Sequence, residues 1–337
     1  MVYAPILIPT LCRYEHFVKC IESLKKNTWA KYTDVYIGLD YPSKDSHWDG
    51  YNKICEYLQG DFSEFASFNV IKRTENYGSG RNMREMRADI LQRYDRFIRT
   101  DDDIEFSQNF LEYMDKCLEH YENDDSVIAV SGYSYPVNWK VSEGSNAFLE
   151  NFVVPMWGTG FWTDKFLKIR SQLSEEKVLV KRFPNIKKYR RNMTDACYLD
   201  YVNDYLSMKP YWLDSISDIA MRIYCAVEGG SVVCPVVSKS RNLGFDGSGV
   251  YCQTIDSTLN GDDANTYSYA NQKIDEDALF EIHIDTENAV DENRTRMNLF
   301  DGRPAKAVKK ASVKLMIYKV LGKKLYSQLL KRKNKVK

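Results

Sequence analysis

The sequence predicts an α/β fold with a mostly parallel central sheet flanked by helices. Over the first 135 residues, short apolar segments of strand length alternate with longer segments whose apolar residues recur every three or four positions. Helices between successive strands favour right-handed crossovers, and therefore parallel pairing. Polar, acidic or Gly-rich residues follow the predicted strands, at the edge of the sheet where ligands bind in such folds.

The elements of this half follow one another in a regular order. The strand Ala4–Ile8 is closed by Pro9, and the segment Glu15–Lys26 has apolar residues at helical spacing. A Gly-rich turn, Asn76–Gly80, separates the third strand from its helix. The remaining elements are strand Val35–Leu39, helix Trp48–Leu58, strand Phe68–Lys72, helix Arg81–Tyr94, strand Arg96–Thr100, helix Asn109–His120 and strand Val127–Ser131.

Composition divides the chain into four parts. Residues 1–135 form the regular α/β half, and residues 136–255 form a less regular half that is rich in Trp, Tyr and Gly. Residues 256–304 are acidic and polar and predict a linker or wrapping segment. Residues 305–337 predict a basic amphipathic helix.

Charge is distributed unevenly along the chain. The 47 basic and 47 acidic residues balance overall, but residues 303–337 hold 13 Lys or Arg and no acid. The preceding 302 residues therefore carry 34 basic and 47 acidic side chains, a net charge of −13. A general nucleic-acid binder needs basic surface over its folded body, so we exclude that class.

The basic C-terminal segment has three interpretations. It could lie on anionic lipid, dock on the acidic body or on a partner, or remain a disordered solubilising tail. We favour the first of these, contact with anionic lipid. Its apolar residues at 3–4 spacing are Val308, Ala311, Leu315, Tyr318, Gly322, Leu325 and Leu329.

Cysteine usage and the N-terminus bear on the compartment. The eight Cys are scattered without a C-x-x-C pair, which favours a reducing compartment, and the four scattered His argue against zinc. The N-terminus lacks a charged region followed by a long apolar stretch, and no run approaches the ~20 apolar residues of a membrane-spanning helix. We expect a cytoplasmic protein, peripheral at the inner face of the cell membrane.

The acidic run Asp101–Asp103 directly follows the fourth predicted strand. Three adjacent carboxylates repel one another and need a compensating cation if the fold confines them. Carboxylate oxygens are hard ligands that suit Mg²⁺ or Mn²⁺. The alternative is a solvated acidic turn.

Other polar residues at the predicted strand ends have equally simple alternatives. Asp40, before a Tyr-Pro pair, could be a turn-former, and the Gly78–Gly80 turn could be an ordinary helix start. Arg81, Arg84 and Arg87 recur at helical spacing and could form a solvated face paired with nearby acids.

Taken in order, these motifs resemble the nucleotide-sugar-dependent glycosyltransferases of the GT-A fold, with a family-2-like pattern over roughly residues 1–255. The motifs are Pro-Ile-Leu-Ile-Pro-Thr-x-x-Arg, an acid after the second strand, Asn-x-Gly, and an acidic triplet in place of D-x-D. The resemblance implies a GT-A-like fold with residues 1–135 binding the donor, and a metal, Mn²⁺ or Mg²⁺, held by Asp103. It implies donor contacts for Thr10, Arg13, Asp40, Asn76, Gly78, Arg81, Asp101 and Asp102.

The second half resembles one branch more closely, N-acetylglucosaminyltransferase I. Residues 101–131 and the Gly-Trp-rich segment 155–162 carry this resemblance, which makes residues 136–255 the acceptor-binding and catalytic half. It implies Asp218 as the catalytic base, with Asp214 as the fallback. The implied acceptor-side residues, which we expect in an accessible loop, are Trp157, Gly158, Thr159 and Gly160. Asp246, Gly247 and Ser248 are further acceptor or loop candidates, because the three glycines that bracket Asp246 suggest a backbone that closes over a ligand; the alternative is an ordinary flexible loop.

The expected activity is metal-dependent, inverting transfer of a sugar from a nucleotide donor, with UDP favoured. The acceptor is a hydroxyl of a glycan or a lipid-linked saccharide in surface polysaccharide synthesis. Sugar-nucleotide pyrophosphorylases share the core, but they carry a Gly-rich loop after the first strand, where this chain has Leu11–Glu15. A calcium-dependent carbohydrate-binding protein is the alternative outside enzymes.

Overall fold

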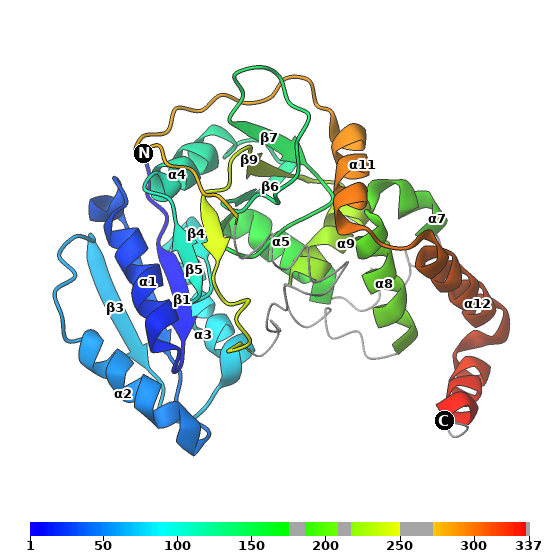
Figure 1. The fold of residues 1–337 in the computed structure, drawn as a ribbon, viewed down its shortest axis with the longest axis horizontal. Helices are drawn as coiled ribbons and strands as arrows, with labels where there is room; N and C mark the ends of the chain where they lie inside the picture. The colour runs from blue at the N-terminus through cyan, green and yellow to red at the C-terminus, as the bar shows by residue number, and fades with distance from the viewer. Residues whose placement is uncertain (175–185, 208–216, 250–271, 335–337) are drawn as a thin grey trace.

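The computed structural model of the chain describes residues 1–174, 186–207, 217–249 and 272–334 (Figure 1). Its first half follows the order expected from the sequence, with strand and helix alternating. The elements are β1 (Ile6–Thr10), α1 (Tyr14–Lys25), β2 (Asp34–Leu39), α2 (Trp48–Tyr57), β3 (Ser67–Lys72), α3 (Gly78–Arg93), β4 (Arg96–Arg99), β5 (Ile104–Phe106), α4 (Phe110–His120) and β6 (Val127–Ser131).

The second half adds strands to the same sheet and helices on one side of it. The elements are β7 (Ala147–Glu150), β8 (Thr159–Trp162), α5 (Thr163–Ser174), α7 (Ile186–Tyr189), α8 (Asp195–Ser207), α9 (Asp218–Glu228), β9 (Ser231–Pro235), β10 (Ser240–Asn242), α11 (Val290–Asp301) and α12 (Ala305–Asn334).

The central sheet has eight strands in the order β3-β2-β1-β4-β8-β6-β9-β7. The β3-β2-β1-β4 block is parallel throughout, and β6 pairs with β9 in parallel. Only β8, between β4 and β6, and β7 at the far edge pair antiparallel to their neighbours within the described residues. The prediction of an α/β fold with a mostly parallel sheet is confirmed.

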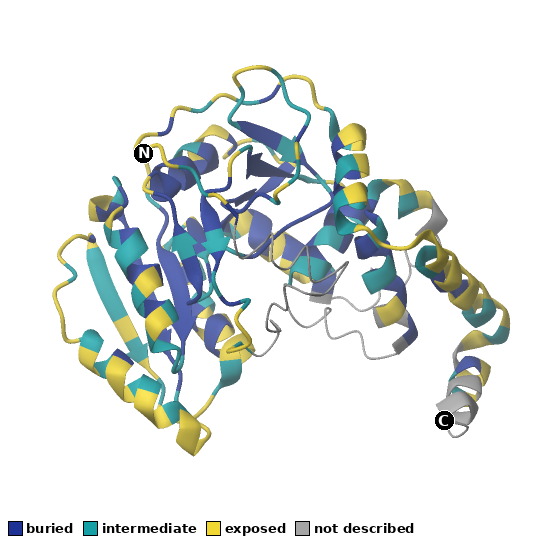
Figure 2. Cartoon of the chain, viewed as in Figure 1, coloured by how far each residue is buried: buried dark blue, intermediate teal, exposed yellow. Residues whose placement is uncertain are grey.

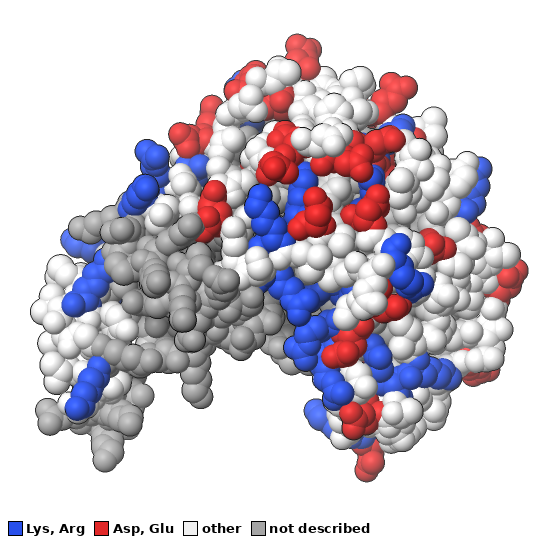
Figure 3. Space-filling model, turned by 180° about the vertical axis from the view of Figure 1, so that it is seen from behind, with Lys and Arg blue, Asp and Glu red and all other residues white. Residues whose placement is uncertain are grey.

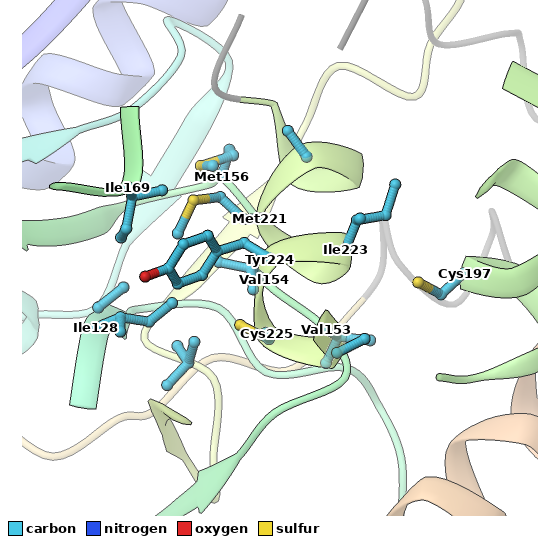
Figure 4. Packing of buried hydrophobic residues seen from close by; sticks show 14 of the residues in the cluster. Ile128, Val153, Val154, Met156, Ile169, Cys197, Met221, Ile223, Tyr224 and Cys225 are labelled. Atoms are coloured by element: carbon cyan, nitrogen blue, oxygen red, sulfur yellow. The ribbon is translucent and has the colours of Figure 1, made fainter. Parts of the chain in front are cut away.

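Two hydrophobic clusters cover the two faces of this sheet. One packs α1, α2 and α4 against the sheet, with Phe17, Ile54 and Leu111 buried. The other packs α3, α5, α8 and α9 against the opposite face. Figure 2 shows the middle strands buried between these layers, whereas the edge strand β3 is half-buried. Figure 4 shows Met221 and Tyr224 of α9 pointing into the second cluster beside Met156.

One expected loop is instead a central strand. The segment Thr159–Trp162 is buried throughout as β8, and a Cβ at Gly160 would lie 2.8 Å from Met114 Cε. The expectation of an accessible loop is therefore wrong for Thr159 and Gly160, and it is also wrong for Gly158, which is buried directly before the strand. Glycine at 160 is explained by the close approach of α4 to the strand, rather than by mobility.

A small second sheet lies beside the main one. β5, directly after the acidic run, pairs antiparallel with β10. Arg241 of β10 forms an ion pair with Glu105 of β5. This pairing carries the chain after β10 back over the acidic run, although the two segments are more than 130 residues apart.

The C-terminal part returns across the sheet before ending in two helices. Residues 272–289 run over the top of the molecule in Figure 1, and Asp285 accepts hydrogen bonds from Ser142 on the way. The helix α12 then packs on α8, where Tyr198 Oη lies 2.9 Å from Ser312 Oγ, and it bends at Gly322. No helix among the described residues is long and apolar enough to cross a membrane.

Part of the apolar stripe that we assigned to lipid is covered by the protein. Ala311 and Leu315 are buried in the cluster that includes α8. Of the three interpretations of the basic segment, docking on the body describes this face of α12. Any lipid contact must use a different face.

Candidate functional site

The predicted donor residues converge at the carboxyl edge of the parallel strands. Thr10 ends β1, Asp40 follows β2, and Asp101 follows β4, and these strands are neighbours in the order β2-β1-β4. Ligands of open α/β sheets bind at this edge, where the side chains of several strands meet.

Two of the three acidic residues face the start of α1. Thr10 Oγ1 donates a hydrogen bond of 2.8 Å to Asp102 Oδ2. Arg13 Nη2 is ion-paired with Asp102 Oδ1, and Arg13 Nη1 lies 2.8 Å from Asp103 Oδ2. One guanidinium thus bridges two carboxylates whose side chains are only 7% and 9% exposed.

Burial and charge oppose one another in this cluster. Burial raises the pKa of Asp102 and Asp103, and the Arg13 charge lowers it only in part. Burial also acts to lower the pKa of Arg13, but the two carboxylates outweigh it and raise that pKa. The carboxylates are therefore short of positive charge even with Arg13 in place.

Asp101 points away from its two neighbours. Its side chain is 37% exposed and lies 2.7 Å from Arg99 Nη2. Because Arg99 and Asp101 are two residues apart in an extended segment, they share one side of the chain, whereas Asp102 turns to Arg13. The acidic run is divided between two environments. Asp101 is partly exposed and paired with Arg99, and burial raises its pKa as well, so the solvated acidic turn describes none of the three residues.

The loop after β10 covers Asp103. Leu243 N donates to the Asp103 carbonyl oxygen at 2.8 Å, and a Cβ at position 244 would lie 2.1 Å from Asp103 Oδ2. Only glycine permits this approach at Gly244. His16 Nε2 of α1 lies 3.1 Å from Asp246 Oδ2 and 3.3 Å from the Leu243 carbonyl oxygen.

These contacts bring Asp246, Gly247 and Ser248 to the predicted donor site. Ser248 N donates to Asp246 Oδ1 at 2.9 Å, and Gly247 has a φ of 83°, so the loop turns tightly beside α1. Sequence analysis missed His16, which belongs to no local motif, and it included Gly244 only as one glycine of the run around Asp246, without the contact to Asp103. Their importance appears only once β10 pairs with β5.

The residues at the acidic run could hold a divalent ion whose remaining coordination positions are filled by a substrate. Asp103 Oδ1 is buried without a hydrogen-bond partner in the described part of the chain, while Oδ2 faces Arg13. No group of three His, Cys, Asp or Glu among the described residues could hold an ion by itself. Mg²⁺ characteristically takes one or two protein carboxylates together with substrate phosphates, and this pattern matches one free carboxylate oxygen.

Asp40 is engaged by the start of α3. Its Oδ1 accepts from Tyr41 N at 2.9 Å and Tyr77 N at 2.7 Å, and its Oδ2 accepts from Gly78 N at 2.7 Å and Asn76 Nδ2 at 3.4 Å. A carboxylate has about four acceptor positions, so these contacts occupy it fully. Asp40 therefore fixes the Gly-rich turn to β2, and a direct contact between Asp40 and a base stays a prediction.

The neighbours of Asp40 include the other predicted donor residues. Asn76 Nδ2 also donates to the Tyr41 carbonyl oxygen at 2.6 Å. The Arg81 guanidinium carbon lies 3.6 Å from the Tyr77 ring centroid, and its Nη1 lies 3.2 Å from Glu75. Gly78 adopts a φ of 70°, where glycine is favoured.

Aromatic side chains form an unpredicted cluster beside this turn. The ring centroids of Tyr41 and Trp48 are 5.5 Å apart, and those of Trp48 and Tyr51 are 5.6 Å apart, both edge to face. Trp48 is 37% exposed. An exposed indole at the carboxyl edge of a parallel sheet is a surface on which an aromatic ligand could stack.

The acceptor-side tryptophan contacts the covering loop. The Trp157 ring lies 4.7 Å from Tyr133 and 5.8 Å from Phe245, and its carbonyl oxygen accepts from Ser240 Oγ at 2.8 Å. Gly158 follows with a φ of 82°. Trp157 and Gly158 thus lie beside the loop that covers Asp103, whereas Thr159 and Gly160 enter the core.

The predicted base starts a helix in the second half. Asp218 is the first residue of α9, is half-exposed, and lies 3.1 Å from Arg222 Nη2. Arg222 also contacts Asp200 at 3.3 Å. The contacts of Asp218 within the described residues do not include the acidic run, and the fallback Asp214 lies outside those residues.

Comparisons with known proteins give distant structural similarities. No family model and no curated protein sequence matches the chain. The chain is similar to the mannosyltransferase PcManGT from Pyrobaculum calidifontis in complex with GDP-Man and Mn²⁺, at 13% identity and a TM-score of 0.32, covering 48% of this chain and 44% of that one.

The chain is also similar to TarS from S. aureus. For TarS 1-349 the identity is 14% and the TM-score 0.34, covering 50% of this chain and 49% of that one. For TarS 1-349 in complex with UDP-GlcNAc the identity is 14% and the TM-score 0.28, covering 44% of this chain and 34% of that one. The match spans less than half of each of these proteins, and TM-scores below 0.5 add nothing to the topology and site described above.

Proposed function

We propose that this protein is a divalent-metal-dependent glycosyltransferase that transfers a sugar from a nucleotide donor, UDP-linked by preference, to a saccharide hydroxyl. The observation that carries the proposal is the Thr10–Arg13–Asp102–Asp103 cluster at the carboxyl edge of β1 and β4, with the residue 243–248 loop folded over it. Buried carboxylates short of positive charge, beside a free carboxylate oxygen, suit a metal diphosphate.

The chemistry needs a cation at this position. Breaking a sugar–phosphate bond leaves charge on the diphosphate, and a divalent ion, when bound, neutralises that charge. Asp103 would hold such an ion through Oδ1, and Arg13 is placed to move from the carboxylates toward the diphosphate. Asp40 holds the turn at which α3 starts, and Trp48 offers a surface for the base.

The acceptor hydroxyl must lose a proton to a carboxylate within hydrogen-bond reach. We assign this task to Asp218, with Asp214 as the alternative. A base on the side opposite the diphosphate gives direct displacement and inverts the anomeric configuration. Trp157, beside the covering loop, is the acceptor-side surface on which a sugar ring would stack.

The proposed acceptor is lipid-linked, as in surface polysaccharide synthesis, and α12 is the proposed membrane contact at the inner face of the cell membrane. Opposite its buried face, α12 exposes Val313, Met316 and Val320, the last with 79% of its surface in solvent. Exposed lysines accompany this second stripe at positions 309, 310, 314 and 324. An apolar stripe bordered by lysines suits an anionic bilayer.

Donor hydrolysis tests the activity. The protein is incubated with a panel of nucleotide sugars and Mn²⁺, and release of the nucleoside diphosphate is measured. We expect one donor to be hydrolysed, and Asp103→Asn to abolish this, while the matched control Asp89→Asn, at an exposed pair with Arg93, retains it. No turnover with any donor, or full activity in Asp103→Asn, contradicts the proposal.

Vesicle flotation tests the membrane contact. Truncating α12 would uncover the core around Leu315, so we substitute Met316→Ser and Val320→Ser together. We expect the wild type to float with vesicles containing phosphatidylglycerol, and the variant to remain in solution. Leu299→Ser, at an exposed leucine of α11, is the control. Equal flotation of variant and wild type contradicts the membrane contact.

A further inference from the structure

Four arginines gather on the α3 and α5 side of the sheet, away from the Arg13 cluster. Arg84 and Arg87 lie on α3, Arg99 ends β4, and Arg170 lies on α5. The spacing of Arg84 and Arg87 had suggested a solvated face paired with Glu85 or Asp89. In the structure Asp89 forms an ion pair with Arg93 instead, so it does not neutralise Arg84 or Arg87.

Packing connects these arginines across three elements. The Arg87 guanidinium carbon lies 4.7 Å from the Phe166 ring of α5, and Phe166 packs edge to face on Phe97 of β4 at 5.2 Å. Arg99 is two residues beyond Phe97 and therefore emerges on the same face of the sheet. Its register partner Leu7 belongs to the cluster on that face.

The topology directs all four toward the substrate edge. α3 starts at the carboxyl edge, so Arg84 lies nearer to that edge than Arg87 does. β8 runs antiparallel to β4, so α5 returns toward the carboxyl edge, and Arg170 lies one turn closer to it than Phe166. Seen from behind, Lys and Arg side chains form a band across the middle of the molecule, in the area of α5 and α3 (Figure 3).

The cluster lacks negative charge. Burial and, after it, the charges of Arg99, Arg170 and Arg84 together lower the pKa of Arg87 to about 10. Arg99 has one acidic partner, Asp101, and its Nε is buried with no acceptor among the described residues. For Arg84, Arg87 and Arg170, no ion pair with another described residue is present. Arg87 and Arg99 are partly buried, whereas Arg84 and Arg170 are exposed. A partly buried guanidinium group without a counter-charge, as at Arg87, is costly unless a ligand provides one.

We propose that Arg84, Arg87, Arg99 and Arg170 form a binding site for a phosphoryl group of a substrate, on the opposite side of the acidic run from Arg13. Guanidinium groups bind phosphate through paired, charge-assisted hydrogen bonds, and the free Nε of Arg99 is one donor of such a pair. The binding site itself does not depend on the proposed transferase function. Only the identity of the molecule that carries the phosphoryl group rests on that function. Arg13 and Asp103 lie at the start of α1, whereas Arg99 emerges on the α3 side of the sheet, so we assign the site to the phosphate of a lipid-linked acceptor rather than to the diphosphate of the donor.

Calorimetric titration with inorganic pyrophosphate tests the site. We expect Arg87→Met to weaken binding about 10- to 100-fold, as for the loss of a charge-assisted contact, and the exposed Arg170→Met to weaken it about 3- to 10-fold. The control is Arg296→Met, at an exposed pair with Glu292. The site is refuted if the wild type does not bind, if Arg87→Met and Arg170→Met bind like the wild type, or if Arg296→Met weakens binding equally.

Thermal unfolding separates binding from a purely structural role. Because Arg87 is repelled by its neighbours, Arg87→Met should melt at the wild-type temperature or above in phosphate-free buffer, and pyrophosphate should no longer raise that temperature. If the melting temperature of Arg87→Met in phosphate-free buffer lies far below that of the wild type, Arg87 has a stabilising counter-charge in the free protein, and the proposed site is overturned.

A second titration with pyrophosphate, in saturating UDP and Mn²⁺, identifies which substrate carries the phosphoryl group that binds at this site. Unchanged pyrophosphate affinity supports a site for the acceptor phosphate, and blocked binding supports a site for the donor diphosphate. If Arg87→Met and Arg170→Met bind pyrophosphate normally while donor hydrolysis still depends on Asp103, this inference fails and the proposed function stands.

Discussion

Substituting Arg13 tests the cluster on which the proposed function depends. Arg13→Met keeps an unbranched apolar stem but removes the guanidinium group, which among the described residues is the one cation that contacts both Asp102 and Asp103. Removing one partner of a buried ion pair costs about 3–5 kcal/mol, because the remaining charge stays buried. The Arg13 side chain is 22% exposed, so solvent screening places the expected loss near the lower end, about 3 kcal/mol at pH 8.

The pH dependence of this loss follows from the direction of the pKa shifts. Burial already raises the pKa of Asp102 and Asp103, and removing Arg13 raises it further. A carboxyl group with a raised pKa binds protons more readily in the folded state than in the unfolded state, so stability falls as pH rises above its ordinary pKa. The loss caused by Arg13→Met should therefore be smaller at pH 5 than at pH 8.

Urea unfolding followed by circular dichroism, at both pH values, measures this effect. Adding Asp102→Asn and Asp103→Asn to Arg13→Met removes the uncompensated charges and should restore much of the lost stability. Mn²⁺ should stabilise Arg13→Met more than the wild type, since the ion replaces the missing cation. A loss below about 1 kcal/mol at pH 8, or a loss independent of pH, refutes the reasoning.

Three further predictions follow from single positions. Gly244→Ala places a methyl group against the Asp103 carboxylate, so it should lower the free energy of unfolding by about 1–3 kcal/mol and weaken Mn²⁺ binding. Gly80→Ala, where a Cβ meets open space, is the control and should change neither quantity. Equal stability of the two variants contradicts the close approach of residue 244 to Asp103. Glu150 is buried, which raises its pKa to about 8, so the free energy of unfolding of the wild type should fall by on the order of 4 kcal/mol between pH 4.5 and pH 8. Glu150→Gln should reduce this fall, measured by urea unfolding at several pH values. An equal fall in the variant rules out Glu150 as its cause. Asp218→Asn should retain UDP affinity in calorimetry but abolish sugar transfer, and near-wild-type turnover removes Asp218 as the base.

The fold of the first half could be predicted because its information is local. Apolar periodicity and turn residues specify each strand and helix within about ten residues, and the alternation of the two elements implies parallel pairing. For the same reason the sequence located Thr10, Asp40 and Asp101 at strand ends, which parallel pairing brings to one edge.

The second half could not be predicted in the same way. The residues Thr159–Trp162 resemble an aromatic, Gly-rich loop, but they fill the space between β4 and β6, and this depends on contacts with distant strands. The stripe of α12 that the sequence suggested for lipid is buried on α8, a choice that no local pattern encodes.

The sequence by itself determined the parallel strands of the first half, the edge at which they end and the acidic run that follows β4. Only the tertiary structure decided how the acids are used, with Asp102 and Asp103 bridged by Arg13, and Asp101 turned to Arg99. It also decided that His16 and Gly244 enclose the site, and that four arginines lie on the α3 and α5 side of the sheet. The physical reason is that periodicity fixes local conformation, whereas the balance of charge depends on burial and on which distant side chains the fold brings together.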